Sequence, residues 1–312
     1  MEWYDILAIV ILSLSFLFFF TTYACYFVAF FIGKKKIYKK DEYDIPPGKA
    51  YEPYRELLAT WMREMRELPH QDIAITSFDN LKLYGTYFEC GKGNTLEIMF
   101  HGYRGNAERD LCGGVKRAFA LNHNVLIVDQ RASSRSDGHT ITFGINERKD
   151  CMSWIKYVLE NFDKDIKIIL TGVSMGAATV IMASEMDLPP NVIGVLADCS
   201  YSNQEGVIKK FIKEIHLPPN LAYPFVKLGA RIYGRFNLEE TTPVKSIKNA
   251  KVPIIIFHGE DDELVPCYMS YELHEANKEM THLVTIPKAG HCLCYLVEPK
   301  LYLKELRDFF NE

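Results

Sequence analysis

Short, continuous apolar runs recur along the last three quarters of the chain, and segments with helical periodicity separate them. The runs show no alternation of polar and apolar side chains, which is typical of strands buried on both faces of a parallel sheet. This order of strands and helices predicts an open α/β sheet with right-handed crossovers and helices on both faces. The apolar runs are 96–100, 125–128, 166–170, 192–196 and 252–257, and the helical patterns lie around 111–121, 147–162 and 175–186.

Two segments ahead of these runs do alternate. Apolar and polar side chains take turns over 73–76 and again over 81–84, with Asp79-Asn80 between them. Alternation on both sides of a turn signal predicts a β-hairpin with one buried face. With a last strand ending near Ile286, the chain is expected to form a mostly parallel sheet of about eight strands.

The N-terminal segment has a different pattern. Residues 6–32 form an uncharged, apolar run of 27 residues, preceded by Glu2 and Asp5 and followed by five lysines between 34 and 40. Such a run is long enough to cross about 30 Å of hydrocarbon as a tilted helix. A cleaved signal peptide has a basic leader and a shorter core. We therefore expect one uncleaved transmembrane anchor rather than a buried core helix.

The lysines also predict an orientation. Lys34, Lys35, Lys36, Lys39 and Lys40 follow the apolar run, and positive charge tends to stay on the cytoplasmic side. The seven cysteines after the anchor are an odd number with no paired framework, which suits a reducing compartment. The expectation is a single-pass protein of the cell membrane with a cytoplasmic catalytic domain.

The segment after the lysines predicts a connection to the main domain. Pro46-Pro47-Gly48 indicates a stiff linker, and residues 54–68 carry apolar side chains at helical spacing among mixed charges. An amphipathic helix docked on the domain is favoured over a helix at the membrane surface, whose charges would be basic. The expected division is an anchor with its basic flank over 1–40, a linker and helix over 41–69, and a catalytic domain over 70–312.

Charge restricts the partners of that domain. The whole chain has a net charge of −4, and beyond residue 40 there are 31 basic residues against 38 acidic ones. No basic face is implied, so nucleic acid is not expected as a partner.

Polar and glycine-rich residues follow the apolar runs, where the strands are expected to end. Ligands of open α/β sheets bind outside the carboxyl ends of the strands. A purely structural sheet does not need this concentration of polar groups. The segments are 101–106, 129–131, Ser174, Asp198, 258–262 and 289–291.

One of these segments has the pattern Gly-x-Ser-x-Gly. Gly172-Val173-Ser174-Met175-Gly176 lies between an apolar run and a helical run of small residues. Strand, sharp turn and helix form the context in which such a serine is exposed for nucleophilic attack. The two glycines allow the strand and the helix to approach closely.

The ordered set of motifs resembles the α/β-hydrolase superfamily, and most of all the bacterial serine hydrolases related to serine aminopeptidases and dipeptidyl-peptidase-like esterases. The resemblance covers about residues 70–312 and depends on five motifs. It departs from the family at Ala132, where glycine is usual. The motifs are His101-Gly102-Tyr103-Arg104-Gly105, Asp129 to Gly138, Gly172 to Gly176, His258 to Pro266, and Gly290-His291.

The resemblance implies a role for each site residue. Ser174 is the expected nucleophile, His291 its base and Asp262 the acid that orients the imidazole. The pattern His-Gly-x-x-Asp-x-x-Val-Pro selects Asp262 over its neighbours Glu260 and Asp261, and Asp198 is a further candidate. The backbone N–H groups of Tyr103 and Met175 are the expected oxyanion hole. His101 and His258 are expected to be structural.

Residues 201–247 interrupt the core where this fold carries a cap. Val207, Ile208, Phe211, Ile212 and Ile215 share one helical face, and Pro218-Pro219 ends the helix. A cap over Ser174 would exclude water and select substrates. Its apolar face favours acyl chains or other lipophilic groups, although packing on the core would produce the same pattern.

These observations predict a serine hydrolase that cleaves carboxylic esters through an acyl-enzyme, without a cofactor. A peptidase or thioesterase with the same triad, acting on a small acyl-ester, lipid-like or peptide substrate, is the alternative. The alternative outside the enzymes is a non-catalytic binding module with the same fold. Cys292 and Cys294 do not have the usual spacing of zinc ligands, so no metal is expected. A further hypothesis is that oxidation of Cys292 perturbs the neighbouring His291.

Overall fold

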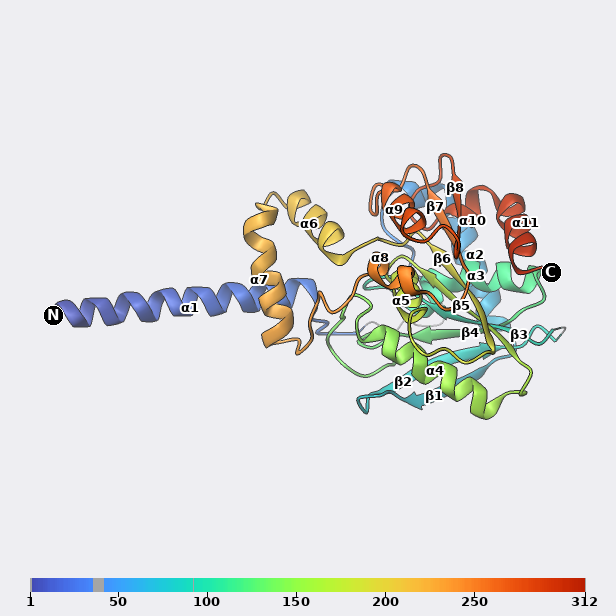
Figure 1. Cartoon of the computed structure of the whole chain (residues 1–312), viewed down its shortest axis with the longest axis horizontal. Coiled ribbons are helices and arrows are strands. Elements are labelled where there is room, and N and C mark those ends of the chain that lie inside the picture. The colour runs from blue at the N-terminus through green and yellow to red at the C-terminus, as the bar shows by residue number, and fades with distance from the viewer. Residues whose placement is uncertain (1, 36–41, 92, 312) are drawn as a thin grey trace.

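The computed structural model describes residues 2–35, 42–91 and 93–311, and its centre is one eight-stranded sheet (Figure 1). The strand order is β1-β2-β4-β3-β5-β6-β7-β8. β2 is antiparallel to β1 and β4, and all other neighbours are parallel. The strands are β1 Gln71–Thr76, β2 Lys82–Phe88, β3 Thr95–Phe100, β4 Asn124–Asp129, β5 Lys167–Val173, β6 Val192–Asp198, β7 Ile254–Gly259 and β8 Thr281–Ile286. The mostly parallel sheet of eight strands is confirmed.

Helices cover both faces of this sheet, as the sequence predicts. On one face α4, α5 and α9 pack against the strands, and on the other α2, α3, α10 and α11 do so. The expected helix over 175–186 ends earlier, where the Ser184 hydroxyl donates to the Ile181 carbonyl at 2.7 Å. The bounds are α2 Arg55–Glu67, α3 Ala107–Ala120, α4 Glu147–Asn161, α5 Met175–Ala183, α8 Pro243–Ser246, α9 Tyr268–Ala276, α10 Cys294–Val297 and α11 Pro299–Phe310, with 3-10 turns at Lys49–Tyr54 and Ile247–Asn249.

The N-terminal helix α1, Trp3–Ala29, projects away from the rest of the molecule (Figure 1). Its most apolar window has a mean hydropathy of 2.3, and only 6% of that window is buried. The helix is long and apolar enough to cross a membrane, and its exposure distinguishes it from a core helix. Of the expected basic flank, Lys36, Lys39 and Lys40 lie outside the described residues, as does Asp41 of the linker.

The last turns of α1 are attached to the domain. Phe30 is completely buried, and Phe31 pairs with Thr140 in a short antiparallel bridge. The Tyr26 hydroxyl lies 2.8 Å from the Thr140 hydroxyl. The base of α1 is therefore part of the folded domain, while its first turns are free of it.

Two helices between β6 and β7 lie beside α1, at the position predicted for the cap. They are α6, Gln204–Glu214, and α7, Pro219–Ile232. Pro219 begins α7, a position at which the missing N–H of proline costs nothing. α7 runs across α1 (Figure 1), and a Cβ at Gly229 would lie only 2.8 Å from the Thr22 carbonyl oxygen. Glycine is thus needed where the two helices cross.

Candidate active site

Ser174 occupies a sharp turn between β5 and α5. Its backbone has φ 55° and ψ −118°, which is a strained conformation for any residue other than glycine. A Cβ at Gly172 would lie 2.2 Å from the Gly176 carbonyl carbon, and one at Gly176 would lie 2.0 Å from the Phe100 oxygen. Both glycines are therefore required by close backbone approach. The Ser174 N–H donates to the Asp198 carbonyl at 2.8 Å, which fixes the turn on the neighbouring strand.

Asp262 and His291 meet in the loops after β7 and β8. His291 Nδ1 lies 2.6 Å from Asp262 Oδ2, and both side chains are buried. The other oxygen, Asp262 Oδ1, accepts from the backbone N–H groups of Leu264 at 2.9 Å and Val265 at 2.8 Å. These donors hold the carboxylate in place. The carboxylate in turn holds the Nδ1 edge of the imidazole and so orients the ring.

The other candidate acids have different surroundings. Asp261 is exposed, and Glu260 accepts from the Thr285 hydroxyl at 2.9 Å. Asp198 accepts from the Tyr302 hydroxyl at 3.0 Å, and burial raises the pKa of its carboxyl well above the usual range. Among these acids, Asp262 is the one for which the described residues show a hydrogen bond to His291.

His258 supports the loop that carries Asp262. It is fully buried, with Nδ1 at 2.6 Å from the Ser270 hydroxyl and Nε2 at 2.8 Å from the Val265 carbonyl. Its Nε2 also lies 3.3 Å from Asp262 Oδ2. These contacts agree with the structural role that the sequence favours.

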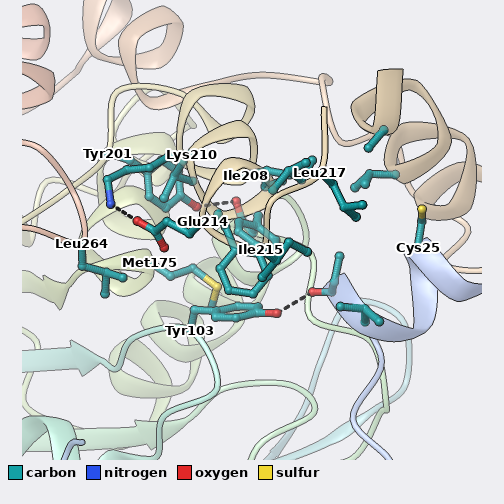
Figure 2. Close-up of a pocket in the computed structure, with 18 of the residues that line it drawn as sticks. Cys25, Tyr103, Met175, Tyr201, Ile208, Lys210, Glu214, Ile215, Leu217 and Leu264 are labelled. Carbon is teal, nitrogen blue, oxygen red and sulfur yellow. Dashed lines mark hydrogen bonds and ion pairs between the residues drawn. The ribbon is translucent and has the colours of Figure 1, made fainter. Parts of the chain in front are cut away.

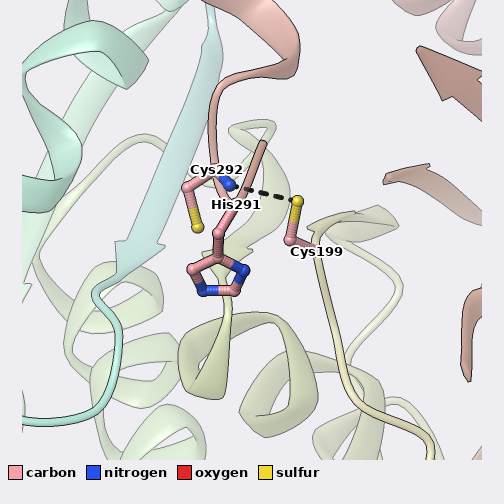
Figure 3. Close-up of side chains that lie close together, drawn as sticks. All are labelled: Cys199, His291 and Cys292. Carbon is pink, nitrogen blue, oxygen red and sulfur yellow. Dashed lines mark hydrogen bonds between the residues drawn. The ribbon is translucent and has the colours of Figure 1, made fainter. Parts of the chain in front are cut away.

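Two thiols also lie close to His291. Figure 3 shows Cys199 and Cys292 beside the imidazole, and the Cys292 N–H donates to Cys199 Sγ at 3.2 Å. Burial opposes a charged imidazole, but the hydrogen bonds to Asp262 and Cys199 raise the pKa of His291 to about 10. Burial also opposes a Cys199 thiolate, but hydrogen bonds from Cys292 and Cys294 and the charge of His258 lower the pKa of Cys199 well below its usual range.

The same cluster contains metal-ligating atoms. The potential ligand atoms of Cys199, His291 and Cys292 lie within 4.8 Å of one another. Thiolate and imidazole are ligands that suit zinc. The spacing of Cys292 and Cys294 along the chain does not suit zinc, but Cys199, directly after β6, adds a third thiol that is distant in sequence. An ion bound here would occupy the imidazole of His291.

The predicted oxyanion loop lies against Ser174. A Cβ at Gly102 would come within 3.4 Å of the Ser174 Cβ, so the chain after β3 passes directly over the serine. The Gly102 N–H donates to Asp110 Oδ2 at 2.9 Å. The His101 ring accepts from the Gln130 N–H at 3.1 Å. These bonds hold the loop that presents Tyr103.

Ser174, Tyr103 and Met175 line one cavity of about 420 Å³. α6 and α7 contribute apolar side chains to it (Figure 2). One side of α1 does so as well, through Phe20, Thr21, Ala24, Cys25, Val28 and Ala29. The Tyr103 hydroxyl donates to the Ala29 carbonyl at 2.7 Å. The cavity therefore lies between the sheet, the helices α6 and α7, and the N-terminal helix α1.

Four contributions to this site were not predicted from the sequence. Asp110 holds Gly102, the Tyr51 hydroxyl donates to the His291 carbonyl at 2.9 Å, Cys199 lies beside His291, and α1 forms a cavity wall. Of these four, only the contribution of α1 could have been recognised from the sequence. Its small residues near the cavity interrupt a run of large side chains and indicate close packing.

Comparison with known sequences finds distant relatives. No family model matches the chain. The uncharacterized protein YqkD of Bacillus subtilis is 23% identical over 192 residues, which cover 61% of this chain and 63% of YqkD. The chain thus spans less than two thirds of that relative's length.

Solved structures show the same fold. The Pyrococcus furiosus esterase Pf2001 superposes with a TM-score of 0.64 at 22% identity, covering 89% of this chain and 98% of the esterase. The α/β hydrolase GrgF from Penicillium gives a TM-score of 0.61 at 17% identity, covering 78% and 98%. Together with the strand order and the serine turn, these likenesses establish that the chain has the α/β-hydrolase fold.

Proposed function

We propose that the protein is a membrane-anchored serine hydrolase that cleaves carboxylic esters through an acyl-enzyme. The observation that carries the proposal is the strained Ser174 turn, which faces an apolar cavity at the end of the sheet where the His291–Asp262 pair also lies. Polar catalytic groups beside an apolar cavity suit a substrate with a lipophilic acyl group.

The reaction begins at the serine hydroxyl. His291 Nε2 accepts the hydroxyl proton while Ser174 Oγ attacks the ester carbonyl carbon. Negative charge then develops on the carbonyl oxygen, and the backbone N–H groups of Tyr103 and Met175 stabilise it. Asp262 accepts a hydrogen bond from the Nδ1–H of His291, which keeps Nε2 free to act as the base and stabilises the imidazolium that forms.

Two further steps complete the cycle. The C–O bond to the leaving group breaks, and His291 donates its proton to the departing alkoxide, leaving the acyl group on Ser174. Water then attacks this ester with His291 again as the base, and the carboxylic acid is released. No cofactor takes part in this sequence.

The test is covalent labelling of the full-length protein with a fluorophosphonate probe. We expect labelling of the wild type and none of Ser174→Ala. Absence of labelling in folded wild-type protein would favour a non-catalytic binding module, and labelling that survives Ser174→Ala would contradict the assignment of the nucleophile. A near-infrared fluorophosphonate allows both to be read from one gel.

The bond that is cleaved is the second part of the proposal. An ester is favoured over a peptide because the cavity lining is almost entirely apolar, and a peptide would bring backbone polar groups that need hydrogen-bond partners. A thioester would present the same acyl group to Ser174. Comparing p-nitrophenyl esters, acyl-thioesters and aminoacyl amides with equal acyl chains distinguishes the three activities.

The location is the third part. We propose that α1 crosses the membrane and that the catalytic domain lies on the cytoplasmic side, since Lys34 and Lys35 follow the helix. A reporter that is active only outside the cytoplasm, fused after residue 312, should be inactive. Activity of that reporter would reverse the orientation.

A further inference from the structure

We propose that the substrate is a long-chain acyl ester of the surrounding bilayer, and that it enters laterally between α1 and the cap helix α6. This deepens the proposed function and depends on it. The juxtaposition that carries it is a cavity containing Ser174 whose wall includes the membrane-spanning helix itself. The anchor would then be part of the acyl-binding site as well as an attachment.

The length of α1 places the cavity mouth at the membrane boundary. Its 27 residues extend about 40 Å at 1.5 Å per residue, about 10 Å more than the hydrocarbon core. If the free N-terminal turns span that core, its edge falls near Thr21 and Ala24. Both residues line the cavity.

The rim of the cavity is apolar and exposed. Phe20 and Val28 of α1 are 58% and 56% exposed, and Phe211 and Leu217 from the opposite side are 52% and 51% exposed, although all four line the cavity. A soluble domain rarely leaves such a contiguous apolar rim in water. At the membrane boundary, acyl chains of lipids would cover it.

The cap helix α7 has a second apolar face of its own. Leu221, Phe225, Leu228 and Ile232 recur at helical spacing, and Leu221 is 67% exposed. The opposite face packs on the domain through buried residues such as Tyr223 and Val226. A helix with this division suits the plane of a membrane interface.

The orientation of α7 agrees with that position. It runs across α1 rather than along it (Figure 1), so a bilayer spanned by α1 would lie parallel to α7. The rings of Phe225 and Phe18 are 5.7 Å apart, which places Phe225 on the side of α7 toward the free turns of α1. This apolar face of α7 thus continues the apolar surface of α1 into the cap.

The inner end of the cavity is suited to an ester group. Ser174 and Met175 line this cavity, and so do Ile208 and Ile212 of α6 and Ile215 directly after it. Figure 2 shows Met175, Ile208 and Ile215 around the same space. An acyl chain can follow this apolar wall while its carbonyl reaches Ser174. Hydrolysis consumes water, breaks the acyl C–O bond and yields a fatty acid and the lipid's alcohol.

The experiment uses the full-length protein in phosphatidylcholine vesicles that contain dipalmitoylglycerol, with soluble p-nitrophenyl butyrate as a second substrate. Ala24→Trp fills the cavity from α1, and Phe27→Trp is the control because Phe27 is exposed on the same helix and does not line the cavity. We expect Ala24→Trp to reduce hydrolysis of the bilayer lipids about tenfold or more, and to reduce that of butyrate less, because the short butyryl chain occupies less of the cavity. Phe27→Trp should change neither.

The outcomes separate the two proposals. If Ser174→Ala leaves turnover of both substrates unchanged, the proposed function fails. If the wild type hydrolyses butyrate in a Ser174-dependent manner but does not hydrolyse bilayer lipids, or does so equally well in Ala24→Trp, lateral entry is wrong.

A binding measurement completes the test without turnover. In Ser174→Ala, phosphatidylcholine with a photoreactive group in its palmitoyl chain should cross-link to peptides of both α1 and α6. Cross-links confined to the first turns of α1 would overturn the inference.

Discussion

At the residue scale, two adjacent aspartates in the loop after β7 have opposite surroundings. Asp262 is buried and bonded to His291, whereas Asp261 is exposed. We expect Asp262→Asn to lower kcat/KM by about four orders of magnitude, because the amide favours the wrong tautomer of the imidazole. Asp261→Asn should retain activity within about twofold. Equal losses in the two variants would contradict the assignment of Asp262.

The thiol beside His291 predicts a particular pH dependence. Because the base must be neutral and its pKa is raised to about 10, kcat/KM for a soluble ester should rise with pH from about 7 toward 10. Cys199→Ala removes one of the groups that raise this pKa, so the midpoint should move to lower pH. Cys151→Ala is the control, since Cys151 is equally buried in the core cluster on the α4 face of the sheet. An unchanged midpoint in Cys199→Ala would show that the thiol does not interact with the imidazole.

At the scale of elements, a buried ion pair joins β3 to its neighbours. Glu97 is fully buried and bonded to Arg117 of α3, to His123 Nδ1 at 2.8 Å and to the Thr171 hydroxyl of β5 at 2.7 Å. Burial opposes the carboxylate, but the charge of Arg117 and the hydrogen bond from His123 lower the pKa of Glu97 to about 2. The carboxylate therefore holds a strand and a helix together.

Removing the charge of Glu97 should lower the free energy of unfolding strongly. Glu97→Gln leaves the Arg117 charge buried and unpaired, which typically costs about 3 to 5 kcal/mol in free energy of unfolding. Glu64→Gln is the control, because the Glu64–Lys116 pair between α2 and α3 is half exposed and worth at most about 1 kcal/mol. Denaturant titration of both full-length variants in detergent measures the difference. Similar midpoints in the two variants would contradict this role of Glu97.

The same residue gives a pH dependence of stability. The pKa of Glu97 is lower in the folded than in the unfolded state, so its contribution is complete above about pH 4.5. That contribution is lost as the pH falls from there toward 2. We expect the wild type to lose stability over this range more steeply than Glu97→Gln. Parallel curves for the two proteins would show that Glu97 does not titrate in this window.

The elements differ in how far the sequence predicts them. The strands were predictable because runs such as 166–170 are buried on both faces and bounded by turns. Ser174 was recognisable because close approach of β5 and α5 requires glycine on both sides of it. Asp110, Tyr51 and Cys199 carried no such local signal, because only tertiary contacts bring them to Gly102 and His291.

At the scale of the whole molecule, the N-terminal helix α1 and the α/β domain form one structure. Hydropathy treats α1 as a uniform apolar helix, so the sequence predicted an attachment joined by a linker. The structure instead buries Phe30 in the same cluster of apolar side chains as Met175, which follows the serine. Phe30 packs edge-to-face against Phe143 and Phe236, and hydropathy averaged over the helix does not register such contacts.

This coupling predicts that the crossing of α1 and α7 affects the distant site. In Gly229→Leu the added side chain meets the Thr22 carbonyl, whose oxygen would be 2.8 Å from the Cβ alone. The helices must move apart, and overpacking of this kind costs about 1 to 3 kcal/mol. Because both helices line the cavity, we expect a lower Tm and an altered preference for acyl chain length, while butyrate hydrolysis at Ser174 persists. Arg231→Ala is an exposed change on the same helix and should alter neither the Tm nor the preference for acyl chain length. An unchanged preference for acyl chain length in Gly229→Leu would show that α1 does not shape the cavity.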